Sequence, residues 1–500
     1  MQFFIDMALS LVYFIGFLLL CAWSWRFWKM YVNQKYLNKY NEDFIMLEIK
    51  LPREIMKSPL ATEMAISSLL QSGGVSTWYV REFKGALPHY ASLEIASIEG
   101  VIHFYVRVQK RFRSIVESSF YAQYPGIEIV EADDYTKMIR YHHLTNTVSC
   151  WGATYYLGKT WNPTNEKTGK PYEDNGDKYK MPADFLPIKT YVDYGLDQNP
   201  KEELKIDPIT TLLEFMGSIK KGEHFWYQIV LQTEGVYDDK KFPKFYVNDQ
   251  THTHMSLADM IEKRKAQIRT AGYKIKGEVV MDEYGDPKQK TIKGEDGKES
   301  KIDILHKETK PITKKEMELT TEEKSELEAI NGKLVAPIAL ATVRLMYITQ
   351  KEKFNGENVM NILSFPKPFS SWNSFAFDTT DPYEYPWQNS RGRRTPWRTE
   401  EMFDSYVERE AFYPHIGERK ALDKWEDDAF WYSSMKARKT WRMFYEAFFH
   451  PFSHPKVKGV SAYNLREIAT LWHLPGTVAT TPSIPRIDSA KGVAPVNLPQ

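Results

Sequence analysis

IMLEIKLP, at residues 45–52, alternates apolar and polar side chains and predicts a half-buried β-strand. Two similar stretches, ASLEIASI at 91–98 and VIHFYVRVQ at 101–109, predict the next strands, and IEIVEA at 127–132 predicts a fourth. Helical patterns at 58–71 and 114–121 separate them, the first opened by Ser58-Pro59 and closed by Gly73-Gly74. The order strand, helix, strand, strand, helix, strand predicts a ferredoxin-like (split βαβ) module over residues 44–159.

A weaker second copy follows over residues 186–368. Its expected elements are strand KTYVDYG at 189–195, helix DPITTLLEFMGSIKKGE at 207–223, strand HFWYQIVLQ at 224–232, strand VRLMYITQKEKF at 343–354 and helix NGENVMNILSF at 355–365. KSPLAT at 57–62 resembles IDPITT at 206–211, which supports a duplication. The predicted fold class is therefore α+β, with two ferredoxin-like modules.

The rest of the chain divides by composition. The expected segments are a polar loop at 160–185, a charged insertion at 282–324, an aromatic-rich extension at 369–474 with a helix at 427–449, and an extended tail or linker at 475–500. The loop and the charged insertion contain few apolar residues, so neither is expected to hold a core.

The N-terminal segment, residues 1–43, reads as a membrane anchor with a juxtamembrane stretch. Residues 7–25 (MALSLVYFIGFLLLCAWSW) contain no charge, and as a helix they would cover about 28 Å, close to the hydrocarbon thickness of a bilayer. A cleaved signal peptide is disfavoured because no basic residue precedes this stretch and its end is bulky. Basic side chains follow the span and Asp6 precedes it, so the body is expected in the cytoplasm. The basic residues are Arg26, Lys29, Lys35 and Lys39.

Composition narrows the range of functions. The chain has 500 residues, 42% hydrophobic and 26% charged, which is typical of a folded protein. Its formal net charge of +1 offers no general attraction for nucleic acid. Cys21 and Cys150 lie in different settings and do not suggest a disulfide, in keeping with a reducing compartment.

No motif in the sequence carries recognisable catalytic chemistry. ATYYLGKT at 153–160 resembles a phosphate-binding loop, but Tyr-Tyr-Leu favours a strand and no convincing helix start follows Lys159. The histidines lack metal-ligand spacing and read as surface or loop residues. They are His142, His143, His252 and His254. We therefore expect a protein that is not an enzyme, with no catalytic residue, no cofactor and no metal.

One basic cluster has aromatic neighbours, RGRRTPWR at residues 391–398. Arginine can pair with phosphate and stack on bases, so this cluster is the candidate nucleic-acid contact. Its residues are Arg391, Arg393, Arg394, Trp397 and Arg398. The alternative is a solvated loop neutralised by nearby glutamates, such as Glu384, Glu400 and Glu401.

Several segments together resemble a known family. They are LEIKLPREIMKSPLATE at 47–63, LEIASIEG with IHFYVR at 93–107, YAQYPGIEIVEADDY at 121–135, PIKTYVDYGLD at 187–197, KIDPITTLLEFMGSIKKGE at 205–223 and LREIATLWHLPGTVATTPSIPRIDSAKGVAPVNLP at 465–499. They resemble the membrane-anchored N-terminal region of bacterial type IV secretion and conjugation ATPase-like proteins, of the VirB/TraC and HerA-like class. In that family the last segment leads into a RecA-like motor domain, which is expected to be absent from this chain.

The resemblance implies a membrane-anchored scaffold or accessory component of a type IV secretion or conjugative DNA-transfer apparatus. Its expected partners are the lipid bilayer, through residues 7–25, and a separate RecA-like secretion ATPase. Homo-oligomer formation is implied only because such motors commonly form rings. The alternative function is a module at the inner membrane that binds and guides single-stranded nucleic acid.

Overall fold

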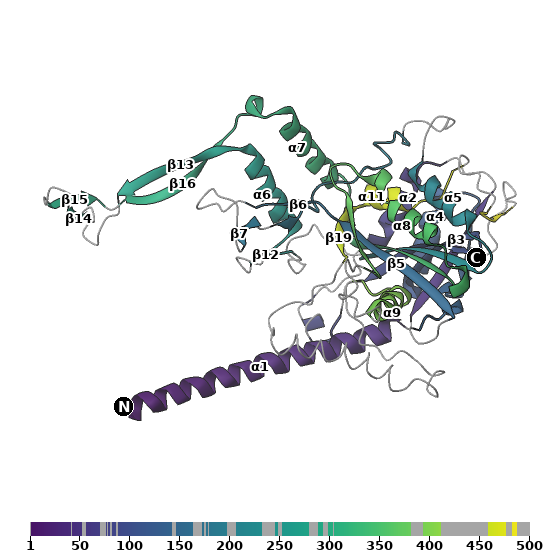
Figure 1. The fold of residues 1–500 in the computed structure, drawn as a ribbon, viewed down its shortest axis with the longest axis horizontal. Coiled ribbons are helices and arrows are strands. Elements are labelled where there is room, and N and C mark those ends of the chain that lie inside the picture. The colour runs from purple at the N-terminus through teal and green to yellow at the C-terminus, as the bar shows by residue number, and fades with distance from the viewer. Residues whose placement is uncertain are drawn as a thin grey trace.

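The computed structural model describes residues 2–41, 43–52, 57–70, 77, 79–80, 83–86, 89–142, 147–163, 173–174, 177–178, 180–197, 207–232, 246–248, 253–279, 289–293, 299–303, 305–381, 394–411, 459–476 and 483–487. Within these residues a mixed α and β body is built on one large sheet, and a single long helix projects from it (Figure 1).

The sheet has ten strands, and its neighbours run in the order β18-β5-β17-β10-β2-β3-β1-β20, with β19 beside β17 and β4 beside β1. Every pairing is antiparallel except that of β1 with β20. The strands are β1 (Phe44–Pro52), β2 (Tyr90–Ile98), β3 (Val101–Gln109), β4 (Glu128–Ala132), β5 (Val148–Leu157), β10 (Glu223–Gln232), β17 (Ile338–Gln350), β18 (Phe375–Thr379), β19 (Ser461–Asn464) and β20 (Arg486–Ile487).

The first half of the sheet contains the predicted elements in the predicted order. Helix α2 (Pro59–Ser67) connects β1 to β2, and α4 (Arg113–Gln123) connects β3 to β4. Side by side, the strands lie in the order β4-β1-β3-β2. The alternating pattern identified these elements because each strand has one face on the main core.

The second half repeats this spatial order with β18-β5-β17-β10. Helix α5 (Pro208–Ser218) precedes β10, and α8 (Gly356–Ser364) follows β17. The strand predicted at 189–195 is wrong, because residues 191–197 form turns. The Asp193 carboxylate accepts hydrogen bonds from the backbone N–H and the hydroxyl of Thr190, a local arrangement that competes with strand pairing. The strand in this position is β5.

The two halves form one continuous sheet through β2 and β10. Their register pairs Glu94 with Gln228 and Leu93 with Ile229. Helices α2, α4, α5, α8 and α11 (Leu465–Leu471) cover one face (Figure 1). The expected helix at 427–449 lies outside the described residues.

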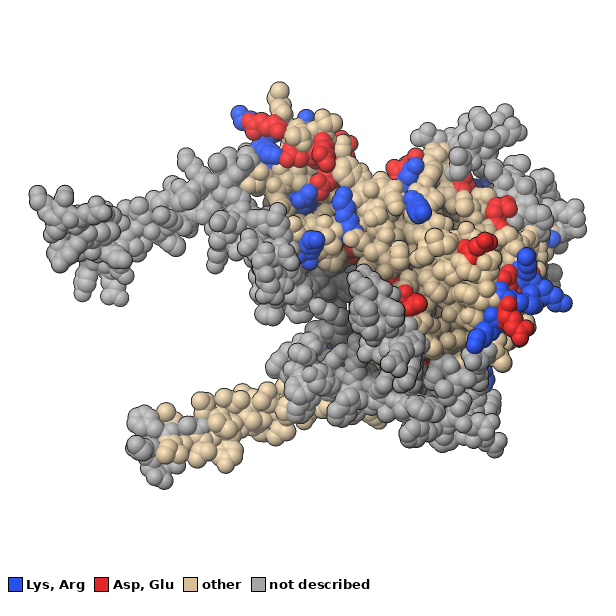
Figure 2. Space-filling model, viewed as in Figure 1, with Lys and Arg blue, Asp and Glu red and all other residues tan. Residues whose placement is uncertain are grey.

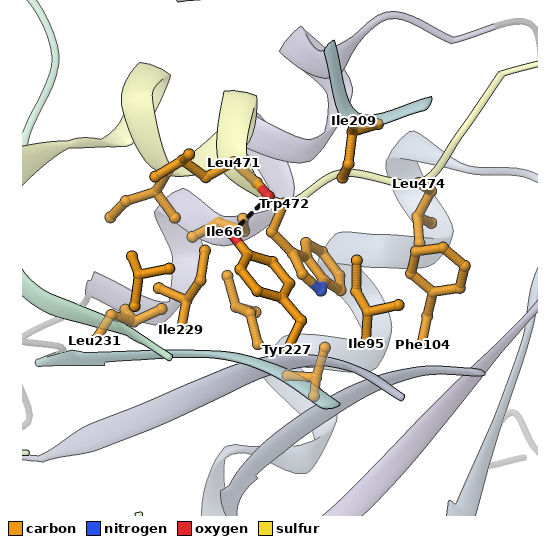
Figure 3. Close-up of a cluster of buried hydrophobic side chains, with 14 of the residues drawn as sticks. Ile66, Ile95, Phe104, Ile209, Tyr227, Ile229, Leu231, Leu471, Trp472 and Leu474 are labelled. Atoms are coloured by element: carbon orange, nitrogen blue, oxygen red, sulfur yellow. Dashed lines mark hydrogen bonds between the residues drawn. The ribbon is translucent and has the colours of Figure 1, made fainter. Parts of the chain in front are cut away.

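Segment 465–474, the last part of the expected aromatic-rich extension, lies in the main core. Trp472 is fully buried between the edges of Phe104 and Phe120, with ring centroids 6.4 and 6.2 Å away. The Tyr227 hydroxyl donates a hydrogen bond of 2.9 Å to the carbonyl oxygen of Leu471 (Figure 3). Burying an indole contributes several kcal/mol, about 3–5 by comparison with truncation to alanine.

The predicted tail also contacts the body. Strand β20 pairs with β1, and the Ile102 amide donates to the carbonyl oxygen of Ser483 at 2.9 Å. Ile484 belongs to the main core. Residues 486–487 of this segment are therefore extended, as expected, and pair as a strand with β1.

A second hydrophobic cluster lies beside the sheet. It is formed around α6 (Leu257–Arg269), α7 (Thr321–Leu334), β6 (Thr160–Trp161) and β9 (Met181–Pro182). The prediction that residues 160–185 hold no core is wrong, because Trp161, Met181 and Phe185 are buried there. Composition missed this because three large apolar residues are spread over a polar segment.

The charged insertion contains strands as well as the start of α7. Strand β13 (Thr270–Val279) pairs with β16 (Leu305–Thr313), and β14 (Gln289–Lys293) pairs with β15 (Glu299–Asp303). Together they make a long arm that extends away from the sheet (Figure 1). The remaining short strands are β7 (Glu173–Asp174), β8 (Asp177–Lys178), β11 (Tyr246–Asn248) and β12 (Thr253–Met255).

Candidate functional site: the apolar helix and its junction with the sheet

Helix α1 (Gln2–Asn41) is long and apolar enough to cross a membrane over Leu9–Asn33. None of the most apolar part of it is buried in the body. Consecutive residues are exposed all round the helix, for example Val12 at 63%, Tyr13 at 74% and Phe14 at 59%. A helix that is apolar on every side has no polar face to turn to water, which is typical of a membrane span. Figure 2 shows this helix projecting from the body, with no charged side chain visible along the described part that projects.

The C-terminal half of α1 packs against the body. Val32 is buried, with 7% of its surface exposed. The backbone of Gly85 lies directly against this turn, since a Cβ at Gly85 would be 2.5 Å from the carbonyl carbon and oxygen of Val32. Gly85 has φ +67°, a conformation that glycine adopts without strain. We call Val32, Tyr36, Tyr79, Phe83 and Gly85 the helix junction.

Aromatic side chains line the outer side of the helix junction. The rings of Trp25 and Phe83 are 5.5 Å apart in an edge arrangement, and Phe83 stacks on Tyr79 at 5.5 Å. Such aromatic pairs contribute about 0.5–1.5 kcal/mol beyond their burial. The Phe83 amide donates to the Tyr79 carbonyl at 2.9 Å, and this hydrogen bond keeps the two stacked residues together.

The inner side of the helix junction connects to the sheet. Tyr36 and Phe44 pack against a buried cluster that contains Tyr90, Val230 and Ala411. Tyr90 belongs to β2 and Val230 to β10, so α1 reaches the strands at which the two halves of the sheet meet. The helix is therefore fixed to the centre of the body rather than tethered to it by a loop.

Helix α9 (Arg394–Val407) covers the other face of the sheet, and an ionic cluster just beyond it attaches it there. Arg409 is fully buried and donates to both oxygens of Glu94, at 3.0 and 3.1 Å. It also donates to both oxygens of Asp134, at 2.6 and 2.9 Å. Arg344 adds a hydrogen bond of 3.0 Å to the Ser405 carbonyl. These bonds join α9 to β2, to β17 and to the loop after β4.

The protonation states of this ionic cluster follow from its geometry. Burial opposes ionisation of Glu94 and Asp134, but the charge and hydrogen bonds of Arg409 outweigh it and hold the pKa of both carboxyls below their usual values. Burial lowers the pKa of Arg344 to about 10, so it stays charged at neutral pH. Tyr135 donates to Glu94 at 2.6 Å, and burial raises its pKa well above 10. The cluster is a satisfied structural network with fixed charges.

Two more buried ionic pairs connect other elements. Lys333 of α7 lies 3.0 Å from Glu467 of α11, both fully buried. His473 contacts Asp207 at 2.8 Å and the Ala469 carbonyl at 2.9 Å, through its two ring nitrogens. The Ala469 carbonyl and the Asp207 carboxylate are both acceptors, so this geometry favours the imidazolium, in which both ring nitrogens donate, and Asp207 raises the pKa of His473.

The predicted nucleic-acid cluster is only partly described. Arg391 and Arg393 lie outside the described residues, whereas Arg394 and Trp397 are in α9 with only their backbones described. Arg398 pairs with the Asp378 carboxylate and donates to the Thr379 carbonyl at 2.8 Å, which joins α9 to β18. This use of Arg398 does not support phosphate binding, and the nucleic-acid function stays a prediction.

The segment that resembles a phosphate-binding loop is a strand, as its β-forming residues predicted. Residues 148–157 form β5, and Thr160–Trp161 form another strand rather than a helix start. The Gly158 amide donates to the Ser374 carbonyl and the Lys159 amide to the Asn373 side chain. These amides are therefore not directed at a common anion.

The histidines are not brought together as a metal site among the described residues. His142 lies in an irregular segment, as expected, but it is buried rather than at the surface. His143 and His252 lie outside the described residues, and the side chain of His254 is not described. Cys21 is exposed on α1 and Cys150 is buried in β5.

Sequence reasoning missed the helix junction and the ionic clusters. Arg409 and Glu94 are 315 positions apart, so no local spacing connects them. The one available signal was a charged residue in the middle of an apolar strand, because Glu94 in ASLEIASI needs a buried partner if both strand faces are covered.

The described residues thus define a mixed helix and sheet protein with a large, mostly antiparallel sheet and one N-terminal helix that is apolar enough to span a membrane. No protein-family model, curated protein or solved structure matches the chain. The family resemblance of the six segments remains an expectation from the sequence.

Proposed function

We propose that this protein is a non-catalytic, membrane-anchored scaffold with its body on the cytoplasmic side of the inner membrane. The observation that carries the proposal is the continuity of α1, whose exposed apolar part runs without a break into Val32, buried against Gly85. A helix joined in this way holds the body at a defined distance from the bilayer. Lys29 and Lys35, which follow the uncharged stretch, favour the cytoplasmic orientation.

We further propose that the body consists of two ferredoxin-like modules joined edge to edge. The strand orders β4-β1-β3-β2 and β18-β5-β17-β10 support this, since each places the fourth strand beside the first and the third beside the second. In each half a helix follows the first and the third strand, if β5 is counted as the first strand of the second half. The contact of β2 with β10 makes one broad platform from the two units.

The proposed role of this platform is to position a separate RecA-like ATPase of a type IV secretion or conjugative DNA-transfer apparatus. Support comes from the family resemblance. Two of the resembling segments supply core elements, β1 with α2 and α11 with Trp472. Residues 486–487 pair with β1 and β4 pairs with the same strand, so this edge of the sheet is the region in which we expect the motor to be held.

The test is affinity purification of the tagged full-length protein from its native membrane in mild detergent. We expect a RecA-like ATPase and ATP hydrolysis in the eluate, absent from a parallel purification without the tag. A matched variant, Leu11→Lys with Leu18→Lys, adds two charges to the span, each costing about 2.5–3.5 kcal/mol near a helix centre. It should lose membrane association and retain ATPase binding. Wild-type protein that elutes alone and inactive would contradict the role in positioning a motor.

A further inference from the structure

We propose that Tyr79, Phe83 and Lys84 form a lipid-contacting surface, with which the body rests on the interfacial layer of the bilayer beside α1. This inference rests on the proposed membrane anchor and adds a second contact between the body and the membrane. The three residues are called the interfacial patch below.

The depth of the interfacial patch follows from the helix. Gly16 is the middle of the uncharged residues 7–25, and Trp25 lies nine residues beyond it, about 14 Å along the helix axis. The hydrocarbon core extends about 15 Å from its centre, so Trp25 is expected at the boundary with the headgroups. Side chains of a helix lean toward its N-terminus, which brings the indole slightly deeper than its Cα. Tryptophan at this depth is typical of membrane proteins.

Because Phe83 contacts Trp25, the depth of Trp25 in the bilayer also sets the depth of this part of the body. The Phe83 ring lies 5.5 Å from the Trp25 ring, and Tyr79 stacks on Phe83. The headgroup layer adds roughly 5–7 Å on each side of the hydrocarbon. The Phe83 ring therefore lies either inside the hydrocarbon core or in the headgroup layer, whichever direction the 5.5 Å from the Trp25 ring takes.

The chemistry of the interfacial patch suits this environment. Tyr79 is 57% exposed and Phe83 38% exposed, although both are large and apolar. The Lys84 ammonium lies 5.9 Å from the centre of the Tyr79 ring, where it can also reach lipid phosphates. An aromatic ring with a polar edge and a lysine with a long stem both place an apolar part in lipid and a polar end in water.

The body begins where the bilayer ends, which argues for lipid as the occupant. Val32 lies sixteen residues beyond Gly16, about 24 Å along the axis and just outside a half-bilayer of about 20–22 Å. The same residue is the one that the body buries at Gly85. Little space therefore remains between the interfacial patch and the membrane for a protein partner.

The experiment measures depth with spin labels on the full-length protein in vesicles of phosphatidylcholine and phosphatidylglycerol. In a Cys21→Ser background, Tyr79→Cys and Phe83→Cys are labelled separately, while Cys150 is buried. Leu18→Cys, in the span, is the lipid reference, and Met360→Cys, 65% exposed on α8, is the water reference. Collision rates with oxygen and with a water-soluble nickel chelate report depth.

We expect the ratio of oxygen to nickel collisions at positions 79 and 83 to lie between the two references. A ratio equal to that at Met360, with Leu18 still in lipid, would overturn the interfacial patch and leave the anchor standing. A water-like ratio at Leu18 as well would overturn the anchor and the patch together. As a second measurement, a photo-reactive phenylalanine analogue at Tyr79 keeps an aromatic ring there. It should form lipid adducts, and their absence when the same analogue at Leu18 forms them would also refute the inference.

Discussion

Replacing Arg409 by methionine should release α9 from the sheet. The substitution keeps a long side chain but removes the cation that pairs with Glu94, which is fully buried, and with Asp134, which is 19% exposed at the side chain. Breaking a buried ion pair by removing one partner costs about 3–5 kcal/mol, because a buried charge is left without compensation. Every 1.4 kcal/mol is a factor of ten, so local opening of α9 should become at least about a hundredfold more frequent.

Hydrogen exchange measured by mass spectrometry on peptides from residues 394–411 reports this opening in the full-length protein. Arg398→Met is the matched control, since its partner Asp378 is partly exposed and such a pair contributes about 0–1 kcal/mol. Adding Glu94→Gln to Arg409→Met should recover part of the loss by removing the uncompensated charge. Exchange in Arg409→Met that stays within a few-fold of Arg398→Met would refute the reasoning.

Three further predictions concern other parts of the body. Gly85→Val places a Cβ 2.5 Å from the backbone of Val32 at a positive φ, so it should loosen α1 from the body. The measurement is a reduced yield of cross-linking, by a flexible bifunctional maleimide, between cysteines placed at Trp25 and Phe83 in a Cys21→Ser background. Burial disfavours the imidazolium of His473, but the carboxylate of Asp207 outweighs this effect and raises the pKa of His473 above 6.5. The pair therefore stabilises the fold fully below pH 6.5, and this stabilisation is lost as the pH rises through the pKa of His473 in the folded protein. Thermal unfolding should show this loss, and Asp207→Asn should remove the part of the slope that His473 causes. Trp472→Ala should lower the free energy of unfolding by about 3–5 kcal/mol in urea titrations, whereas Met360→Ala, at an exposed site, should change it by less than about 0.5 kcal/mol.

Local sequence patterns were sufficient to predict the helices and strands of the first half of the sheet. The strand predicted at 101–109 matches β3 in both bounds, and the helix predicted from 58 contains α2. Period-two alternation and a Pro-opened helix are properties of a few neighbouring residues, which explains this agreement. The same patterns were misleading at 189–195, where the Asp193 carboxylate accepts hydrogen bonds from Thr190 and the chain forms turns despite its strand-like alternation.

Sequence patterns could not predict the helix junction. The span itself was evident, because nineteen uncharged residues have a length that matches a bilayer. Its attachment was not, since Gly85 and Phe83 lie in a short segment whose sequence has neither a strand-like nor a helix-like periodicity. Similarly, the composition of segment 465–474 did not show that α11 and Trp472 lie in the main core, near the pairing of β19 with β17.

The sequence by itself determined an apolar helix at the N-terminus, the mixed α and β character of the body and the order of its first six elements. These depend on the charge, size and spacing of residues close together in the chain. Only the tertiary structure decided which strands lie side by side, which charges are buried in pairs and where α1 meets the sheet. The pairs Arg409 with Glu94 and Lys333 with Glu467 join positions 315 and 134 residues apart. Such contacts depend on the folding of the whole sheet, because only the folded sheet brings these side chains together and removes the water that would otherwise solvate them.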